Sequence, residues 1–219
     1  MGKFNERLQR QIDDFRDRIL TDSVGVLDPE DLHHEFVSGN HGKKLDFDKI
    51  QKEQDFDLYT EWVSLYARSI HALYGGRIPD ALVGIANGAN RLSTDVAGLL
   101  GKKVMGLTTV KIDTKTVKLD DEAIDAIRSG NIKFALTIED VGTTGSTTSS
   151  VISELRAEGV KRIESITTWQ RNPSLPRLDE YCIPYSSLIS EPLPMFSPED
   201  CVSDPEGYCF QGITLIPHD

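Results

Sequence analysis

The segment that points most directly to a fold is Ile138-Glu139-Asp140-Val141-Gly142-Thr143-Thr144-Gly145-Ser146-Thr147. An apolar run, Phe134 to Ile138, precedes two adjacent carboxylates and a loop of Gly, Thr and Ser. A helical pattern follows, with Val151, Ile152 and Leu155 as its apolar positions. This order predicts a buried strand that leads through a small, hydroxyl-rich loop into a helix.

The loop has the chemistry of a phosphate site. The first turn of a helix presents N–H groups without intrahelical partners, and the helix dipole is positive there. Gly142 and Gly145 permit close backbone approach and unusual dihedrals. We therefore expect a phosphate to bind the segment of small residues that opens the helix: Thr143, Thr144, Gly145, Ser146 and Thr147.

The two acids have a different role, because a carboxylate repels a phosphate. Glu139 and Asp140 are suited to accept hydrogen bonds from vicinal hydroxyls, or to hold Mg²⁺ directly or through water. The predicted ligand thus carries both a phosphate and a diol, as a ribose 5-phosphate does. We predict that both acids are catalytic residues and metal ligands.

The segment fits other phosphate-binding motifs less well. A nucleotide-hydrolase P-loop would need Gly-Lys-[Ser/Thr], and a dinucleotide fold would need G-x-G-x-x-G after a strand; the chain has neither. The simplest alternative is an N-capped helix after a buried strand, with Asp140 as a turn residue. The dense run of hydroxyl and glycine residues directly after two acids disfavours it.

The segment resembles the motif by which type I phosphoribosyltransferases bind PRPP (5-phospho-α-D-ribosyl 1-diphosphate): an apolar strand, two acids and Thr-Thr-Gly. The Glu-Asp order with Thr-Thr-Gly-Ser is similar to that of orotate phosphoribosyltransferases. The resemblance implies transfer of ribose 5-phosphate from PRPP to a nucleobase such as orotate, as in pyrimidine biosynthesis. It also implies Mg²⁺ as cofactor and a homodimer.

Composition limits the class of protein. The chain has 219 residues, 38% of them hydrophobic and 27% charged, which is ordinary for a soluble protein. The net charge of −11 and the lack of an evident basic face argue against nucleic acid as a partner. No apolar run is long enough to span a membrane, and residues 1–18 do not form a signal peptide. We expect a cytoplasmic protein.

The apolar patterns alternate between strands and helices, which predicts an α/β fold. We expect a central, mostly parallel sheet with helices on both faces. The predicted helices are 4–19, 56–74, 92–100, a short one ending near 129, and one ending at 158; the predicted strands are 80–86, 103–110, 134–138 and 162–169. We predict one domain, 1–219, in which 1–50 and 173–219 contribute a small hood and flanks. From Pro173 onward we expect short strands or turns at most.

A second βα loop, Ala86 to Asn90, should lie at the same edge of the sheet. It resembles the family's pyrophosphate loop, in which small residues expose N–H groups to the leaving diphosphate. This predicts that Asn87 and Gly88 bind PRPP. The alternative is an ordinary turn with Asn90 as helix N-cap.

Lysines follow the 103–110 strand. In the resembling enzymes a mobile loop here closes over the substrate and brings a lysine to the diphosphate, which would exclude water and stabilise the developing charge. We predict that Lys111 is catalytic and that Lys115 binds PRPP. The loop lacks the arginine and histidine that are common in the family, so solvated lysines are the alternative.

Two segments resemble the base-binding parts of orotate enzymes. Ser38-Gly39, with His41 two residues on, resembles the hood segment over the base; the alternative for His41 is a simple turn cap. Arg171 ends the 162–169 strand where the family places an arginine that pairs with the orotate carboxylate, and a guanidinium forms a two-pronged bond to a carboxylate. We predict that Ser38, Gly39 and Arg171 bind the base, with an exposed loop arginine as the alternative.

Three cysteines, at 182, 201 and 209, are too few for a disulfide framework. Zinc needs four ligands, and the sequence offers only Cys182 and His218 as helpers to Cys201 and Cys209. We therefore expect no zinc site.

Two alternatives to an orotate enzyme stay open: a transferase for another purine or pyrimidine base, and a non-catalytic PRPP-binding regulator.

Overall fold

A computed structural model of the chain describes residues 4–21, 26–27, 32–36, 39–52, 56–113, 116–130, 132–171 and 183–217. The main sheet has five strands in the order β4-β3-β7-β8-β9, and every neighbouring pair is parallel. Their bounds are β3 Ala81–Gly84, β4 Met105–Leu107, β7 Phe134–Gly142, β8 Arg162–Gln170 and β9 Tyr185–Ser190. The predicted α/β architecture is confirmed.

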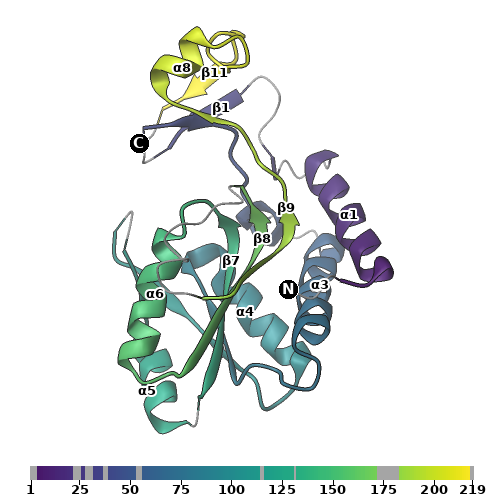
Figure 1. Cartoon of the computed structure of the whole chain (residues 1–219), viewed down its shortest axis with the longest axis vertical. Helices are drawn as coiled ribbons and strands as arrows, with labels where there is room; N and C mark the ends of the chain where they lie inside the picture. Colours follow the sequence, from purple (N-terminus) through teal and green to yellow (C-terminus); the bar gives the residue numbers. More distant parts are fainter. Residues whose placement is uncertain are drawn as a thin grey trace.

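Helices cover both faces of this sheet (Figure 1). Successive strand residues point to opposite faces, so Leu82 and Leu136 join one apolar cluster while Ala81 and Ala135 join the other. The first cluster includes residues of α1, α3 and α4; the second includes residues of α5 and α6. These helices are α1 Glu6–Thr21, α3 Phe56–Tyr74, α4 Ala86–Leu100, α5 Asp121–Ser129 and α6 Ser146–Ala157.

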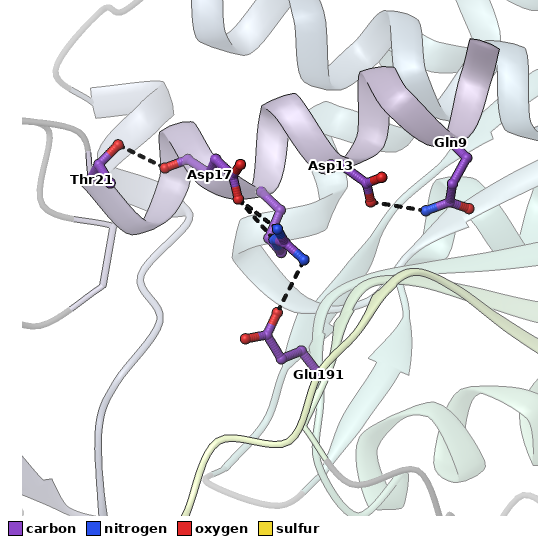
Figure 2. Close-up of polar contacts among 6 residues, drawn as sticks. Gln9, Asp13, Asp17, Thr21 and Glu191 are labelled. Atoms are coloured by element: carbon purple, nitrogen blue, oxygen red, sulfur yellow. Dashed lines mark hydrogen bonds and ion pairs between the residues drawn. The ribbon is translucent and has the colours of Figure 1, made fainter. Parts of the chain in front are cut away.

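Helix α1 packs against α3 and the edge strand β9, with Leu8, Ile12, Phe15 and Ile19 buried. Arg16 forms an ion pair with Asp17 at 2.7 Å and a longer one with Glu191, just after β9, at 3.8 Å. Figure 2 shows Glu191 across from the helix, and Gln9 donating to Asp13 one turn away. Since these polar groups are largely exposed, the buried apolar stripe provides most of the attachment.

A second, four-stranded sheet has the order β10-β2-β1-β11, with β1 Leu32–Glu35, β2 His41–Gly42, β10 Met195–Phe196 and β11 Thr214–Ile216. Strand β1 pairs antiparallel with β2 and parallel with β11, so N-terminal and C-terminal segments share this sheet. A short helix, α8 Pro198–Ser203, belongs to the same unit. We call residues 32–36, 39–42 and 194–217 the hood, because they stand beyond the ends of β8 and β9 (Figure 1).

Several boundaries differ from the prediction. The tail after Pro173 does more than form short strands or turns: β9 completes the main sheet, and α8 is a helix whose N-cap Ser197 accepts from the N–H of Asp200. The 103–110 strand is divided into β4 and β5, Thr109–Lys111, and β5 forms an antiparallel hairpin with β6, Val117–Leu119. The polar 22–49 segment also contains strands, and α2, Asp48–Lys52, follows them. Tertiary pairing determined these elements, which local periodicity does not encode.

None of the helices in the described part of the chain combines the length and the apolarity that a membrane crossing requires.

Candidate active site

The predicted phosphate loop lies at the carboxyl end of the central strand β7. The strand continues to Gly142, so Glu139 and Asp140 belong to it and not to the loop. Gly145 is the N-cap of α6 and has a left-handed φ of 68°, as expected for a glycine in this position. The N–H groups of the first turn of α6 are thereby presented at the sheet edge, where the predicted phosphate would lie.

Glu139 is buried, and both of its carboxylate oxygens are used within the chain. Thr147 Oγ1 donates to one oxygen and Thr148 Oγ1 to the other, each at 2.7 Å. Burial raises the pKa of Glu139 to about 7, although the two threonine hydroxyls oppose the rise. Glu139 therefore fixes the start of α6. Because the Thr147 hydroxyl donates to Glu139, Thr147 would contact a phosphate through its backbone N–H.

Asp140 lies beside the second predicted loop. A Cβ added to Gly88 would come within 2.5 Å of Asp140 Oδ2 and 3.0 Å of Asp48 Oδ1, so only glycine fits between these two carboxylates. Desolvation raises the pKa of Asp140 to about 6, the N–H of Val141 opposes the rise, and the negative charges of Asp48 and Asp46 add to it. Two carboxylates that face each other across Gly88, with a third negative charge nearby, favour a cation there.

The second loop differs from its prediction, because helix α4 starts at Ala86 and includes residues 87–90. Asn90 is not an N-cap; its side chain donates to the carbonyl of Thr109 at 2.8 Å and accepts from the Thr109 N–H at 3.0 Å. Ala86 has a φ of 58°, which is strained for a non-glycine residue. Of Asn87 the structure describes only the backbone, in the first turn of α4.

The lysine segment is a hairpin anchored to α6. Ser150 Oγ donates to the carbonyl of Val117, and Glu154 accepts from the N–H of Leu119. Lys111 ends β5 opposite Val117, with its side chain exposed. Lys115 lies outside the described residues. The hairpin therefore has a fixed base, and exposure leaves the Lys111 side chain able to reach a ligand.

Arg171 follows directly after β8 and is only 5% exposed, so the alternative of an exposed loop arginine is wrong. Its guanidinium lies 5.0 Å from the ring centre of Phe36, which belongs to the hood. Gly39 lies in the turn between β1 and β2, with a φ of 79°, while Ser38 lies outside the described residues. The contact between Phe36 and Arg171 brings the hood to the same sheet edge as Asp140.

A family model for the phosphoribosyl transferase domain matches residues 62–196, which is more than half of the chain. The chain belongs to the phosphoribosyltransferase family. The match covers the phosphate loop, the Ala86–Asn90 segment and the lysine hairpin of this transferase. A sequence search of curated proteins found no match.

Solved structures similar to this transferase include an orotate phosphoribosyltransferase from Aeropyrum pernix, with a TM-score of 0.60 and 15% identity over 78% of this chain and 91% of that one. The Mycobacterium tuberculosis orotate phosphoribosyltransferase has a TM-score of 0.56 and 14% identity over 84% and 95%. An adenine phosphoribosyltransferase (APRTase) from Giardia lamblia has a TM-score of 0.50 and 17% identity over 69% and 87%. At these identities the likeness shows the type I phosphoribosyltransferase fold.

Sequence reasoning missed several residues around the transferase site. Asp48 faces Gly88, Gln51 of α2 donates to the carbonyl of Gly88 at 2.8 Å, and the Tyr185 hydroxyl lies against the backbone of Gly142. The only sequence signal was a faint one, the acid pair of Asp46-Phe47-Asp48 in a segment read as irregular.

A groove of about 870 Å³ between α1 and β9 shares no residue with the site.

Proposed function

We propose that this phosphoribosyltransferase uses orotate as acceptor and PRPP as donor. A bond forms between the orotate ring nitrogen and the anomeric carbon of the ribose while the bond from that carbon to the diphosphate oxygen breaks. The diphosphate leaves, and the proton of the ring nitrogen passes to the diphosphate or to solvent. The products are orotidine 5'-monophosphate and diphosphate. The observation that carries the proposal is Arg171, a buried cation under the hood, at the edge of the sheet that also carries Asp140.

The donor would occupy the β7–α6 segment. Its 5-phosphate would bind the N–H groups at the start of α6, with the hydroxyls of Thr143, Thr144 and Ser146 beside them. Thr144 and Ser146 already lie within hydrogen-bonding distance, Oγ1 to Oγ at 3.2 Å. Asp140 would face the ribose hydroxyls and, through its negative charge, support the positive charge that develops on the sugar as the diphosphate departs.

Mg²⁺ is the cofactor that this donor set suits. Asp140 would hold it directly or through water, with Asp48 across Gly88, because carboxylate oxygens are its preferred protein ligands. The ion would supply charge neutralisation of the diphosphate. Glu139 is less suited to the metal than we first predicted, because both of its oxygens accept from threonine hydroxyls.

The acceptor would lie between Phe36 and Arg171. A carboxylate matches a guanidinium with two parallel hydrogen bonds. Orotate carries such a carboxylate, whereas adenine does not. The hood and the lysine hairpin would enclose the base and the diphosphate, which keeps water from the sugar cation. We further propose a homodimer, from the resemblance stated above.

The test is diphosphate release from PRPP with Mg²⁺ and each base in turn: orotate, uracil, adenine, guanine and hypoxanthine. We expect turnover with orotate and a loss of it when the orotate carboxylate is replaced by a carboxamide. Turnover with adenine alone would move the assignment to another base. PRPP binding without release of diphosphate for any base would support a regulator instead.

A further inference from the structure

Four potential metal ligands meet inside the hood, on elements far apart in the sequence. They are His33 on β1, His41 on β2, Cys201 on α8 and Cys209 in the turns after α8. Their ligand atoms all lie within 4.8 Å of one another, and three of the four residues are buried. Both cysteines are free thiols. The helpers considered from sequence, Cys182 and His218, lie outside the described residues.

The distances match those of a tetrahedral zinc site. Zinc–sulfur bonds of about 2.3 Å and zinc–nitrogen bonds of about 2.0 Å place neighbouring ligand atoms roughly 3.3–3.8 Å apart. Cys209 Sγ lies 3.4 Å from His33 Nε2 and 3.4 Å from His41 Nδ1, and Cys201 Sγ lies 3.9 Å from His33 Nε2. For these three pairs a metal ion would require shifts of only tenths of an ångström.

The backbone is shaped around Cys201. The N–H of Cys209 donates to Cys201 Sγ at 3.2 Å, which helps to hold the sulfur in place. The N–H of Phe210 donates to the Cys201 carbonyl at 2.9 Å. A Cβ at Gly207 would lie 2.4 Å from that carbonyl oxygen, so glycine is required for the chain to fold back this closely. The ring of Tyr208 packs on His33, with centroids 5.4 Å apart.

The hood has little else inside it. Among its described residues, none belongs to either buried apolar cluster of the molecule. Val202 is 62% exposed and Phe210 57%, and the rings of Phe196 and Tyr208, which contact each other, are only half-buried. A unit this small without an apolar core usually depends on a disulfide or a metal for its stability. The two histidines and Cys201 occupy the place where a core would be.

We propose that His33, His41, Cys201 and Cys209 bind one structural Zn²⁺ ion. Two thiolates and two neutral imidazoles in a tetrahedral arrangement suit zinc, and the two thiolate charges balance the ion, so the buried centre is neutral. Each thiol loses its proton to solvent as the ion binds. The site joins the β1–β2 hairpin to the C-terminal segment, and thereby fixes the strand that leads into Phe36 over Arg171.

Zinc content tests this directly. The untagged chain, purified under reducing conditions after growth with added zinc, should hold about one zinc ion per chain by elemental mass spectrometry. Reduced, metal-free protein titrated with Co²⁺ should develop the intense visible bands of a tetrahedral ion and the charge-transfer band of cobalt thiolates. Both signals should fall to about zero in Cys209→Ser and His41→Gln.

Matched controls are Cys182→Ser, a change at the third cysteine, and His34→Gln, a change at the neighbouring position of β1, where the side chain faces away from the buried interior. Both should keep the metal and the cobalt spectrum.

If the ligand variants do not fold, the wild-type protein still decides: its Cys201 and Cys209 thiols should resist alkylation until a chelator is added. The proposal is overturned by wild-type protein that gives no cobalt spectrum, by an unchanged spectrum in Cys209→Ser, or by a Cys201–Cys209 disulfide in protein isolated from cells. None of these readouts depends on the base that the enzyme uses.

Discussion

The carboxyl edge of β7 and the hood are built in opposite ways, although they face the same candidate site. The edge rests between two apolar clusters, and its functional groups follow one another within ten residues, Ile138 to Thr147. The hood has no share in those clusters among its described residues, and its sheet joins β1 to β11 from the other end of the chain. A contiguous motif on a packed strand thus presents the proposed donor site, whereas long-range pairing forms the proposed acceptor side.

This difference predicts which changes affect the donor and which affect the base. Substitutions at the β7 edge should abolish chemistry whatever the acceptor, because the edge would hold the sugar that every acceptor shares. Substitutions under the hood should change acceptor affinity and leave PRPP binding intact.

The largest effect should come from Asp140→Asn. We expect turnover to fall by about a thousandfold, because a neutral amide gives no electrostatic support to the developing sugar cation. Diphosphate release under saturating orotate and PRPP measures it. Asp125→Asn, at an exposed position on α5, is the matched control and should be unaffected. Retention of more than about a tenth of the turnover would remove Asp140 from the proposed catalytic role.

The next effect should come from Arg171→Lys, which keeps the charge but removes the two-pronged donor. We expect KM for orotate to rise by about a hundredfold, with KM for PRPP changed by less than about twofold. Steady-state kinetics with each substrate varied separately distinguishes the two. An equal rise in both KM values would contradict the proposal that the hood side affects the acceptor and the β7 edge affects the donor.

A smaller effect is expected at the lysine hairpin. Lys111→Ala should lower turnover by about tenfold, since one cation near the diphosphate is lost. Lys118→Ala is the matched control on the partner strand, where Lys118 pairs with Val110, and should change turnover by less than about twofold. Equal losses in the two variants would mean that general hairpin charge, and not a positioned lysine, supports the reaction.

The smallest effect is a pH dependence. With the pKa of Asp140 at about 6, the carboxylate fraction rises about fourfold between pH 5.5 and 7, and affinity for PRPP with Mg²⁺ should follow it. Calorimetric titration at the two pH values measures the change. Asp140→Asn should retain only the pH dependence of the ligand itself, so identical pH profiles for the two proteins would contradict the assignment.

The raised pKa of Asp140 affects the stability of the ligand-free protein in the opposite direction to its effect on PRPP affinity. A carboxyl whose pKa rises on folding from 3.8 to about 6 stabilises the folded state below pH 3.8 relative to higher pH. This contribution is lost as the pH rises through 6. The ligand-free protein should therefore lose stability over the range in which it gains affinity for the metal-bound donor.

Local pattern predicted most of the main sheet, because its strands and helices are encoded by runs of apolar residues that the core then buries. Helix α3 has the predicted bounds, and β8 ends one residue later than expected. The hood could not be predicted in this way. Its strands are two to four residues long, and β1 pairs with β11 across nearly the whole chain, so no local periodicity reveals them.

The candidate site shows the same division. Asp140 and Gly145 were predicted from one motif, and their positions on β7 and at the start of α6 agree with it. The bonding of Glu139 to two threonines was missed, because the pitch of α6 that brings Thr148 back to the strand is a tertiary property. His33 and His41 were missed as partners of the cysteines for the same reason: their proximity depends on the pairing of distant strands.

The parallel pairing of β1 with β11 also determines an order of events during synthesis. Leu32 leaves the ribosome early, but its partner Thr214 emerges only after the whole main sheet has been made. The proposed PRPP edge at β7 can therefore fold while the hood is still open, because domains form as their segments become available. A nascent chain would acquire its donor site first, and the cover over the acceptor would close last.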